Sequence, residues 1–374
     1  MAGISFRAIA LLYITLGSSS SATLPHARLP AGFTAALYRD NLADPRGLAV
    51  AASGDLLVVE RGGAVSRVRA LWDSDGDGSS SSSETVLLAT SAPGLNHGVA
   101  LSAGFLFASS DTTVYRWPYD GYTRGDLGPH TIVINNINAD GSGGAPRGHT
   151  TRTLEFGPSG QLFVSVGSAG NVDANSLRSR VRVFPAAAVT AATMTSAIDF
   201  FTGTVWADGL RNEVGLATDD AGALWGVENG ADGLQRADLG GDIHNDNPGE
   251  ELNKLDSAGA FYGYPYCWSE YCLSGERGRG VTAQWAWPSF MGGAIPYTDK
   301  WCSNLANVQP PKLVIQAHSA PLGIAFLTQS VPCQNGTHTR RNVTFPSAFP
   351  CSMRGDAFVA LHGSWNRDVR RRRA

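Results

Sequence analysis

Imidazole, guanidinium and amide side chains recur in short polar phrases along this 374-residue sequence. Such groups can accept a proton, bind a carboxylate or donate hydrogen bonds to an oxygen-rich ligand. A single histidine is more often a turn or core residue, but repeated phrases of one kind indicate a shared site. The phrases are Asn96-His97-Gly98, Arg147-Gly148-His149, Leu210-Arg211-Asn212, His318-Ser319-Ala320-Pro321 and Leu361-His362-Gly363-Ser364-Trp365-Asn366-Arg367.

A second dense region combines small residues with carboxylates. Glu228-Asn229-Gly230-Ala231-Asp232 is followed by Asn247-Pro248-Gly249-Glu250-Glu251. Because Gly230 has no side chain, backbone carbonyls beside it can turn toward a hard cation. Glu250 and Glu251 add negative charge of the right kind. The region indicates a calcium site, with an ordinary acidic surface turn as the alternative.

A calcium-loop pattern lies nearer the N-terminus. Asp73-Ser74-Asp75-Gly76-Asp77-Gly78, followed by Glu84, matches D-x-D-x-D-G-x5-E, whose alternating carboxylates can wrap a cation. The flanking segments 65–71 and 86–88 favour strands, so a helix–loop–helix unit is not expected. Two interpretations stay open: a structural calcium held by Asp73, Asp75, Asp77 and Glu84, or an unoccupied acidic turn.

A repeated hairpin could supply the scaffold for these groups. Each copy has a short apolar run, a turn containing glycine and a second strand, and the first four recur at roughly 50 to 60 residues. One hairpin cannot bury its own apolar face, whereas radially packed neighbours can. The spacing favours an all-β propeller over a β-sandwich, and the polar phrases would then meet at the central channel. The copies begin at Gly47, Gly98, Leu154, Gly215 and Gly323.

Composition and the N-terminus bound the class of protein. A net charge of -3 argues against a nucleic-acid surface, and 43% hydrophobic with 16% charged residues argues against disorder. Residues 1–22 match an export signal, with a disordered or anchoring N-terminus as the alternative. No later stretch is long enough to span a membrane. We therefore predict a secreted, extracellular protein whose residues 23–374 form a single propeller domain. The Ala- and Thr-rich segment 186–196 is predicted as a loop or short helix.

The five cysteines all lie in the C-terminal third and fit an oxidising compartment. We favour disulfides Cys333–Cys351 and Cys267–Cys302, and the odd number leaves Cys272 over. No spacing of cysteine and histidine indicates zinc. Two glycosylation sequons, at Asn335 and Asn342, fall between Cys333 and Cys351. This predicts a glycosylated surface insertion at about 331–353.

Several longer phrases together resemble a known family, the soluble quinoprotein aldose dehydrogenases, and within it the sorbosone and pyranose dehydrogenase branch. The order of the phrases is specific, although each is short, and they extend from Pro45 to Arg367. The phrases are Gly209-Leu210-Arg211-Asn212-Glu213-Val214-Gly215-Leu216-Ala217, Trp225-Gly226-Val227-Glu228-Asn229-Gly230, Glu250-Glu251-Leu252-Asn253, His149-Thr150-Thr151-Arg152, Tyr262-Gly263-Tyr264-Pro265-Tyr266-Cys267, His318-Ser319-Ala320-Pro321-Leu322-Gly323 and His362-Gly363-Ser364-Trp365-Asn366-Arg367.

The resemblance implies a six-bladed propeller that holds pyrroloquinoline quinone (PQQ) and Ca²⁺ at its channel mouth. It implies that His149 is the general base, taking the hydroxyl proton of a sugar while hydride leaves carbon for the quinone. Arg211 and Asn212 match cofactor contacts, where a guanidinium would stabilise charge on the reduced ring.

The remaining site residues follow in the same way. Gly230 and Ala231 match backbone-carbonyl ligands of the calcium that bridges to the cofactor, and Glu251 is a further candidate ligand. His318 and His362 fall where family members contact the cofactor, although the glucose dehydrogenase branch has Lys in place of His362. His97 is a candidate for the channel only.

The end of the chain departs from the family. The family continues through the rest of the fifth blade and a sixth blade, whereas this sequence ends in a basic run, 368–374. We therefore expect a C-terminal truncation that leaves the last blade wholly or partly missing, with exposed strand edges.

The expected activity is PQQ- and calcium-dependent oxidation of an aldose or ketoaldose, such as glucose, sorbosone or a pyranose. Electrons would pass to an external acceptor, with neither nucleic acid nor membrane as partner. The alternatives are a calcium-dependent lactonase of the paraoxonase kind, and an inactive secreted binding propeller.

Overall fold

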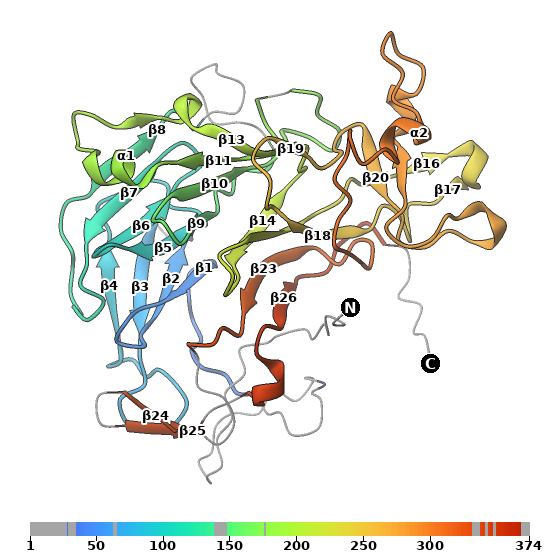
Figure 1. The fold of residues 1–374 in the computed structure, drawn as a ribbon. Helices are drawn as coiled ribbons and strands as arrows, with labels where there is room; N and C mark the ends of the chain where they lie inside the picture. The colour runs from blue at the N-terminus through green and yellow to red at the C-terminus, as the bar shows by residue number, and fades with distance from the viewer. Residues whose placement is uncertain are drawn as a thin grey trace.

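The computed structural model describes residues 28, 35–62, 66–137, 148–175, 177–330, 337–340, 343–346 and 349–367. Antiparallel sheets dominate this part of the chain and stand around a common centre, as Figure 1 shows. The all-β class and the β-propeller arrangement are therefore confirmed. The part of the chain that is described contains no helix long and apolar enough for a membrane span.

The first two sheets are consecutive four-stranded meanders. Sheet one runs β1 (Pro45–Val50), β2 (Leu56–Glu60), β3 (Arg67–Leu71) and β4 (Thr85–Ala89). Sheet two runs β5 (Val99–Ser102), β6 (Phe105–Ser109), β7 (Val114–Pro118) and β8 (Thr131–Asn135). Leucine and valine are the commonest residues of these strands, and sheet two adds aromatic residues, which suits a pleated, half-buried surface.

The next two sheets repeat this plan. Sheet three contains β9 (Leu154–Phe156), β10 (Leu162–Val166), β11 (Arg180–Phe184) and β13 (Thr204–Asp208). Sheet four contains β14 (Glu213–Thr218), β15 (Leu224–Glu228), β18 (Glu250–Lys254) and β22 (Leu313–Ile315). A fifth sheet pairs β23 (Pro321–Phe326) with β26 (Ala357–Leu361).

Short parallel strands link neighbouring parts of the fold. β12 (Ile198–Asp199), which lies between strands of sheet three in sequence, pairs in parallel with β8 of sheet two. β19 (Ala260–Phe261), which follows β18 of sheet four, pairs in parallel with β13 of sheet three. Each added strand therefore joins a sheet to the chain segment that builds the sheet after it.

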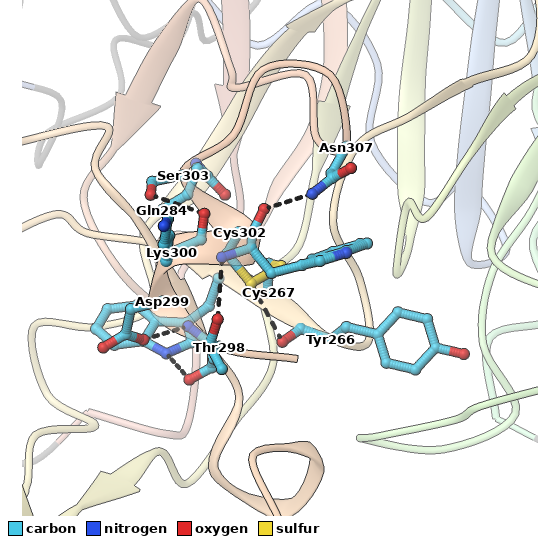
Figure 2. The surroundings of a disulfide bond; sticks show 12 residues. Tyr266, Cys267, Gln284, Thr298, Asp299, Lys300, Cys302, Ser303 and Asn307 are labelled. Atoms are coloured by element: carbon cyan, nitrogen blue, oxygen red, sulfur yellow. Dashed lines mark hydrogen bonds between the residues drawn. A yellow bond between two sulfur atoms is a disulfide. The ribbon is translucent and has the colours of Figure 1, made fainter. Parts of the chain in front are cut away.

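Between β18 and β22 the chain makes a long excursion from the sheets, stabilised by a disulfide. It contains β20 (Cys267–Ser269), β21 (Gln284–Ala286) and the short helix α2 (Asp299–Cys302). Figure 2 shows Cys267 of β20 bonded to Cys302 of α2, with a Cα–Cα distance of 5.7 Å. Thr298 caps this helix, accepting the N–H of Trp301 at 3.1 Å. The predicted Cys267–Cys302 pair is confirmed, and Cys272 is free and exposed.

The smaller elements complete the description. The helix α1 (Ala186–Ala191) settles the alternative left open for 186–196 in favour of a short helix. The other small elements are β16 (Gln235–Arg236), β17 (Gly241–Asp242), β24 (Thr337–Arg340), β25 (Val343–Pro346) and the 3-10 helices Phe200–Thr202, Ala237–Leu239, Gly275–Arg277, Pro288–Phe290 and Cys351–Met353.

The hydrophobic core lies between successive sheets rather than in one central mass. Leu57 of sheet one packs with Trp117 of sheet two, and Phe107 of sheet two packs with Leu162 of sheet three. Phe163 of sheet three packs with Leu216 of sheet four. Each hairpin thus buries its apolar face against the next one, as the repeat predicted.

The first strands of the sheets approach one another most closely. A Cβ atom added at Gly47 would collide with the carbonyl of His97, and one added at Gly98 would collide with that of Arg152. Only glycine permits this backbone approach at the centre of the fold. The starts of these strands consequently meet around one axis.

All five predicted hairpins are present, in four sheets of four or five strands and a fifth of two. The count of six blades stays a prediction. The leader, Cys333, the two acceptor asparagines of the sequons and the basic run 368–374 lie outside the described residues, as does Arg147.

Candidate active site

One cavity of about 680 Å³ opens where the starts and ends of several strands meet. Six of the predicted site residues line it: His149, Arg211, Asn212, Gly230, His318 and His362. They come from the segments before β9, β14 and β23 and after β15 and β26. The other lining residues are Asn229, Asp232, Glu250, Ala320, Gly363, Ser364, Trp365 and Arg367.

The imidazole of His149 is held in one tautomer. Its Nδ1 lies 3.1 Å from the carbonyl oxygen of Ser168 and 3.0 Å from the Ser168 hydroxyl, which itself donates to Gly170. Because a carbonyl can only accept, Nδ1 carries the proton and Nε2 keeps a lone pair. Burial, followed by the nearby charge of Arg211, lowers the pKa of His149 to about 4. The ring is therefore neutral at pH 7 and able to accept a proton.

Arg211 is buried and fixed on several sides. Its Nε donates to the carbonyl of Asn171 at 3.1 Å, its Nη1 to the carbonyl of Asn229 at 3.2 Å and its Nη2 to Asp232 at 3.2 Å. Its backbone N–H donates to the carboxylate of Glu228. These contacts hold the positive charge of Arg211 at the cavity wall. The carboxylate of Asp232 does not form a bidentate pair with the guanidinium, so the charge is only partly compensated.

Asp232 joins three of the cavity's segments. Besides Arg211, its carboxylate accepts the amide of Asn366 at 3.0 Å and lies 3.6 Å from Nδ1 of His318. The Nε2 of His318 is 2.5 Å from the carbonyl of His244. His318 and Ala320 both have positive φ, 57° and 48°, an uncommon conformation for such residues that often marks functional sites.

Glu250 provides a second carboxylate at the cavity. It accepts the backbone N–H of Gly230 at 2.6 Å and that of Ala320 at 3.1 Å, so it ties sheet four to the start of β23. Burial raises the pKa of Glu250 to about 7, against the opposing effect of these hydrogen bonds.

A further part of the cavity wall comes from the segment that follows β26. His362 is exposed there, with Nδ1 3.0 Å from the carbonyl of Gly363. The indole of Trp365 is 85% exposed, so a flat aromatic face is available to a ligand. Arg367 donates to the carbonyl of Ala317 at 3.0 Å and to Asp246 at 3.1 Å.

Three predicted residues do not line this cavity. His97 is buried, and its Nδ1 has no partner among the described residues. Ala231 and Glu251 line a separate small cavity on the other side of sheet four. Glu251 and Glu250 are neighbours in β18, and successive strand residues point to opposite faces, so only Glu250 reaches the large cavity. The roles predicted for these three residues gain no support from their positions.

The acidic loop joins β3 to β4 without helices, as expected. Asp73, Asp75 and Glu84 offer carboxylate oxygens within 4.8 Å of one another, and Asp77 is not in this group. Glu84 accepts the hydroxyl of Ser74 and the backbone N–H of Ser81, which lower its pKa to about 2 against the effect of burial. Because its own loop already satisfies Glu84, both interpretations of the loop remain open.

Sequence reasoning assigned no role to several residues that line the cavity. Asp232 is the last residue of the segment 228–232 predicted near calcium, and Trp365 and Arg367 lie in the quoted phrase after β26. These residues could have been found from the sequence, because each is a charged or aromatic residue within a glycine-containing phrase already assigned to the site. Glu250 was credited only with charge, since adjacent strand residues cannot be assigned to a face without the register.

Comparisons with known proteins agree with this geometry. Residues 27–371 match the TrAA12-like family. A PQQ-dependent sugar dehydrogenase of Hypocrea jecorina is 35% identical over 79% of this chain and 69% of its own length. A PQQ-dependent pyranose dehydrogenase of Coprinopsis cinerea is 31% identical over 90% of this chain but only 42% of its own length.

Two solved structures share the fold. A calcium structure of a Trichoderma reesei enzyme of carbohydrate-active family AA12 has a TM-score of 0.68 at 29% identity, covering 86% of this chain and 85% of that one. The holo PQQ domain of the Coprinopsis cinerea pyranose dehydrogenase has a TM-score of 0.70 at 24% identity, covering 94% and 88%. The chain therefore belongs to the TrAA12-like family, in which PQQ-dependent sugar and pyranose dehydrogenases are its relatives.

Proposed function

We propose that this protein oxidises the anomeric or a neighbouring hydroxyl of a sugar, or its hydrated aldehyde, with PQQ as the electron acceptor. The observation that carries the proposal is the neutral imidazole of His149, whose Nδ1 is held by Ser168, in one cavity with the guanidinium of Arg211. The names of the relatives supply the chemistry to be tested.

The cavity fits an anionic, planar cofactor. PQQ carries carboxylates and quinone oxygens, and Arg211, Arg367 and the histidines offer donors of the matching kind. The exposed face of Trp365 suits a flat ring system. The volume of about 680 Å³ lies within the usual range for cofactor and substrate sites.

The cavity's carboxylates argue for a cation as well. Asp232 and Glu250 would repel an anionic cofactor unless a positive ion lay between them and it. Gly230 bears no side chain and lies against Glu250, so its carbonyl is a candidate ligand, as the family resemblance implies. We propose Ca²⁺ for this position, with the carbonyl of Gly230 as a ligand. The resemblance implies Ala231 as a second backbone ligand, although Ala231 lines the small cavity instead of the large one.

The chain's own residues then divide the work. Bound PQQ supplies a two-electron acceptor for hydride. His149 takes the hydroxyl proton at Nε2, and such assistance is worth about 10²- to 10⁴-fold. Arg211 and Asn212 orient the cofactor, and the positive charge of Arg211 favours its reduced form.

Three further proposals complete the assignment. The substrate is an aldose or ketoaldose, electrons leave to an external acceptor, and the protein is exported through the N-terminal leader. A lactonase would instead need side-chain ligands around one metal and no quinone, so lactone hydrolysis without added cofactor favours that alternative.

The test is dye reduction across a panel of aldoses and ketoaldoses by protein reconstituted with PQQ and CaCl₂. His149→Gln should lower kcat by at least 10²-fold while PQQ still binds, because the substitution removes the base. His130→Gln is the matched control, since His130 also faces a serine through Nδ1, at 3.2 Å, but does not line the cavity. Full activity of His149→Gln, or no sugar turnover by the native chain, would refute the proposal.

A further inference from the structure

The loop between β10 and β11 contacts both principal residues of the large cavity. The carbonyl of Ser168 accepts the backbone N–H of His149 at 3.1 Å as well as its Nδ1, and the N–H of Ser168 donates to the carbonyl of Arg211 at 2.8 Å. Asn171 accepts Nε of Arg211 with its carbonyl and Nη2 with its amide oxygen, each at 3.1 Å. One short segment, residues 168–173, therefore positions the imidazole and the guanidinium together.

The side chain of Asn171 also ties this segment to the cavity wall. Its amide oxygen accepts the backbone N–H of Asp232 at 2.7 Å, and its amide nitrogen donates to the carbonyl of Asp232 at 2.7 Å. The carboxylate of Asp232 in turn contacts Nη2 of Arg211 at 3.2 Å. Because these contacts constrain several atoms at once, they fix the orientation of the guanidinium, and a shift of the segment would move it.

One phenol from a distant part of the sequence supports the segment. The hydroxyl of Tyr264, between β19 and β20, accepts the backbone N–H of Asp173 at 2.7 Å and donates to the carbonyl of Asn171 at 3.1 Å. The carbonyl of Gly170, which accepts the Ser168 hydroxyl, lies 3.5 Å from the same phenol oxygen. Tyr264 is buried, and its hydroxyl both donates and accepts, so phenylalanine could not replace these contacts.

Tyr264 is itself firmly placed. Its backbone N–H donates at 3.0 Å to the carbonyl of Gly209, which follows the last residue of β13. Three residues on, Cys267 forms the disulfide to Cys302 that Figure 2 shows. Tyr264 lines the small cavity instead of the large one, so its effect on the site passes through residues 168–173.

We propose that Tyr264 is a positioning residue, whose hydroxyl holds residues 168–173 so that His149 and Arg211 keep a fixed relation in the cavity. Tyr264 acts on the site of the proposed function, so the proposal rests on that function. It also gives the excursion between β18 and β22 a part in the reaction, because the phenol comes from the base of that excursion.

The test compares Tyr264→Phe with Tyr262→Phe. Tyr262 is the matched control, because it is also buried and its hydroxyl donates to the carbonyl of Lys254 at 2.8 Å, away from residues 168–173. Tyr264→Phe should weaken PQQ binding about tenfold in a fluorescence titration with CaCl₂, since the guanidinium is no longer preorganised. It should lower kcat about tenfold, less than the roughly 10²-fold that a misplacement of about 1 Å can cost. Tyr262→Phe should keep native values of both.

A readout without cofactor or sugar separates this proposal from the proposed function. In a chain labelled with ¹⁵N-histidine, the ring nitrogens of His149 report which of them carries the proton, and His149→Gln identifies their signals. The native chain and Tyr262→Phe should carry the proton on Nδ1. Tyr264→Phe should show a mixture of tautomers, because the carbonyl of Ser168 is no longer held in place. Absence of sugar turnover by the native chain would refute the proposed function, whereas the tautomers still decide the role of Tyr264.

Asn171→Ala tests the path from the phenol to the guanidinium. It removes the amide contacts to Arg211 but keeps the carbonyl of Ser168, so PQQ binding should weaken while His149 keeps its native tautomer. Combined with Tyr264→Phe, it should weaken binding by less than the product of the two single effects, because both act through one segment. Should Tyr264→Phe fail to fold, unchanged PQQ binding by Asn171→Ala, at an exposed residue, would overturn the path.

Two further results would overturn the proposal. In the first, folded Tyr264→Phe keeps native PQQ binding, kcat and histidine tautomer. In the second, Tyr262→Phe shows the same losses as Tyr264→Phe, because the effect would then come from general packing at the base of the excursion.

Discussion

A methyl group at Gly167 would press on the active site without removing any functional group. An ideal Cβ there lies 2.7 Å from Oδ1 of Asn212, 2.7 Å from Cβ of His149 and 3.3 Å from the carbonyl oxygen of Arg211. Ordinary contact begins at 3.4 Å, so the first two atoms must each withdraw by 3.4 − 2.7 = 0.7 Å. The Asn212 amide can rotate, but His149 meets the methyl near its backbone and must move as a whole.

A displacement of this size has a predictable cost. Misplacing a catalytic group by about 1 Å can lower the rate by about 10²-fold, so Gly167→Ala should lower kcat by roughly 30- to 100-fold. Overpacking should also cost about 1–3 kcal/mol of stability, which leaves the protein folded at 25 °C. The assay is dye reduction by enzyme reconstituted with PQQ and CaCl₂, with a thermal melt of each variant.

Gly170→Ala is the control, because it lies in the same loop and its Cβ would meet nothing within 4 Å. It should keep native kcat and melting temperature. If Gly167→Ala folds and keeps kcat within twofold of the native value, then His149 does not need its present position. The role proposed for His149 would be refuted with it.

Three further outcomes are expected. Burial lowers the pKa of His97 to about 4, so the unfolded chain takes up the proton at a higher pH than the folded chain does. The free energy of unfolding should therefore fall by about 3 kcal/mol as the pH drops from 6.5 through 4. Denaturant titrations across this pH range should show a smaller loss for His97→Phe. Arg211→Lys should weaken PQQ binding at least tenfold in a fluorescence titration, because lysine cannot reproduce the guanidinium's separate contacts. Cys267→Ser with Cys302→Ser opens a link of sequence separation 35 and should cost about 4 kcal/mol in denaturant unfolding.

The fold was predictable because its repeat is local. Each hairpin shows a glycine turn between two apolar runs, and each strand start is polar, so the meeting of His149, Arg211 and His318 followed from the architecture alone. The link between Cys267 and Cys302 was also predicted correctly.

The site residues that were not predicted depend on strand register and on how far each side chain lies from the cavity along the central axis. Neither property can be read from a short stretch of sequence. Glu250 and Glu251 are the same residue type in neighbouring positions, yet strand alternation directs Glu250 to the large cavity and Glu251 to the opposite face of sheet four. His97 occupies a strand start like those of the site residues, but its side chain is buried outside the large cavity. The alignment of Glu213, Glu228 and Glu251 across sheet four is likewise visible only when the registers of β14, β15 and β18 are known.

The two parallel additions bear on how such a fold could change over generations. β12 pairs with sheet two although its neighbours in sequence belong to sheet three, and β19 pairs with sheet three although it follows a strand of sheet four. The segment of sequence that contains one repeat is therefore not the segment that forms one complete sheet. Deleting one repeat from the sequence would remove the added parallel strand from the preceding sheet and leave the edge of that sheet exposed. Recombination between relatives should therefore give folded proteins more often when the breakpoint lies just after β12 or β19 than when it lies between two sequence repeats.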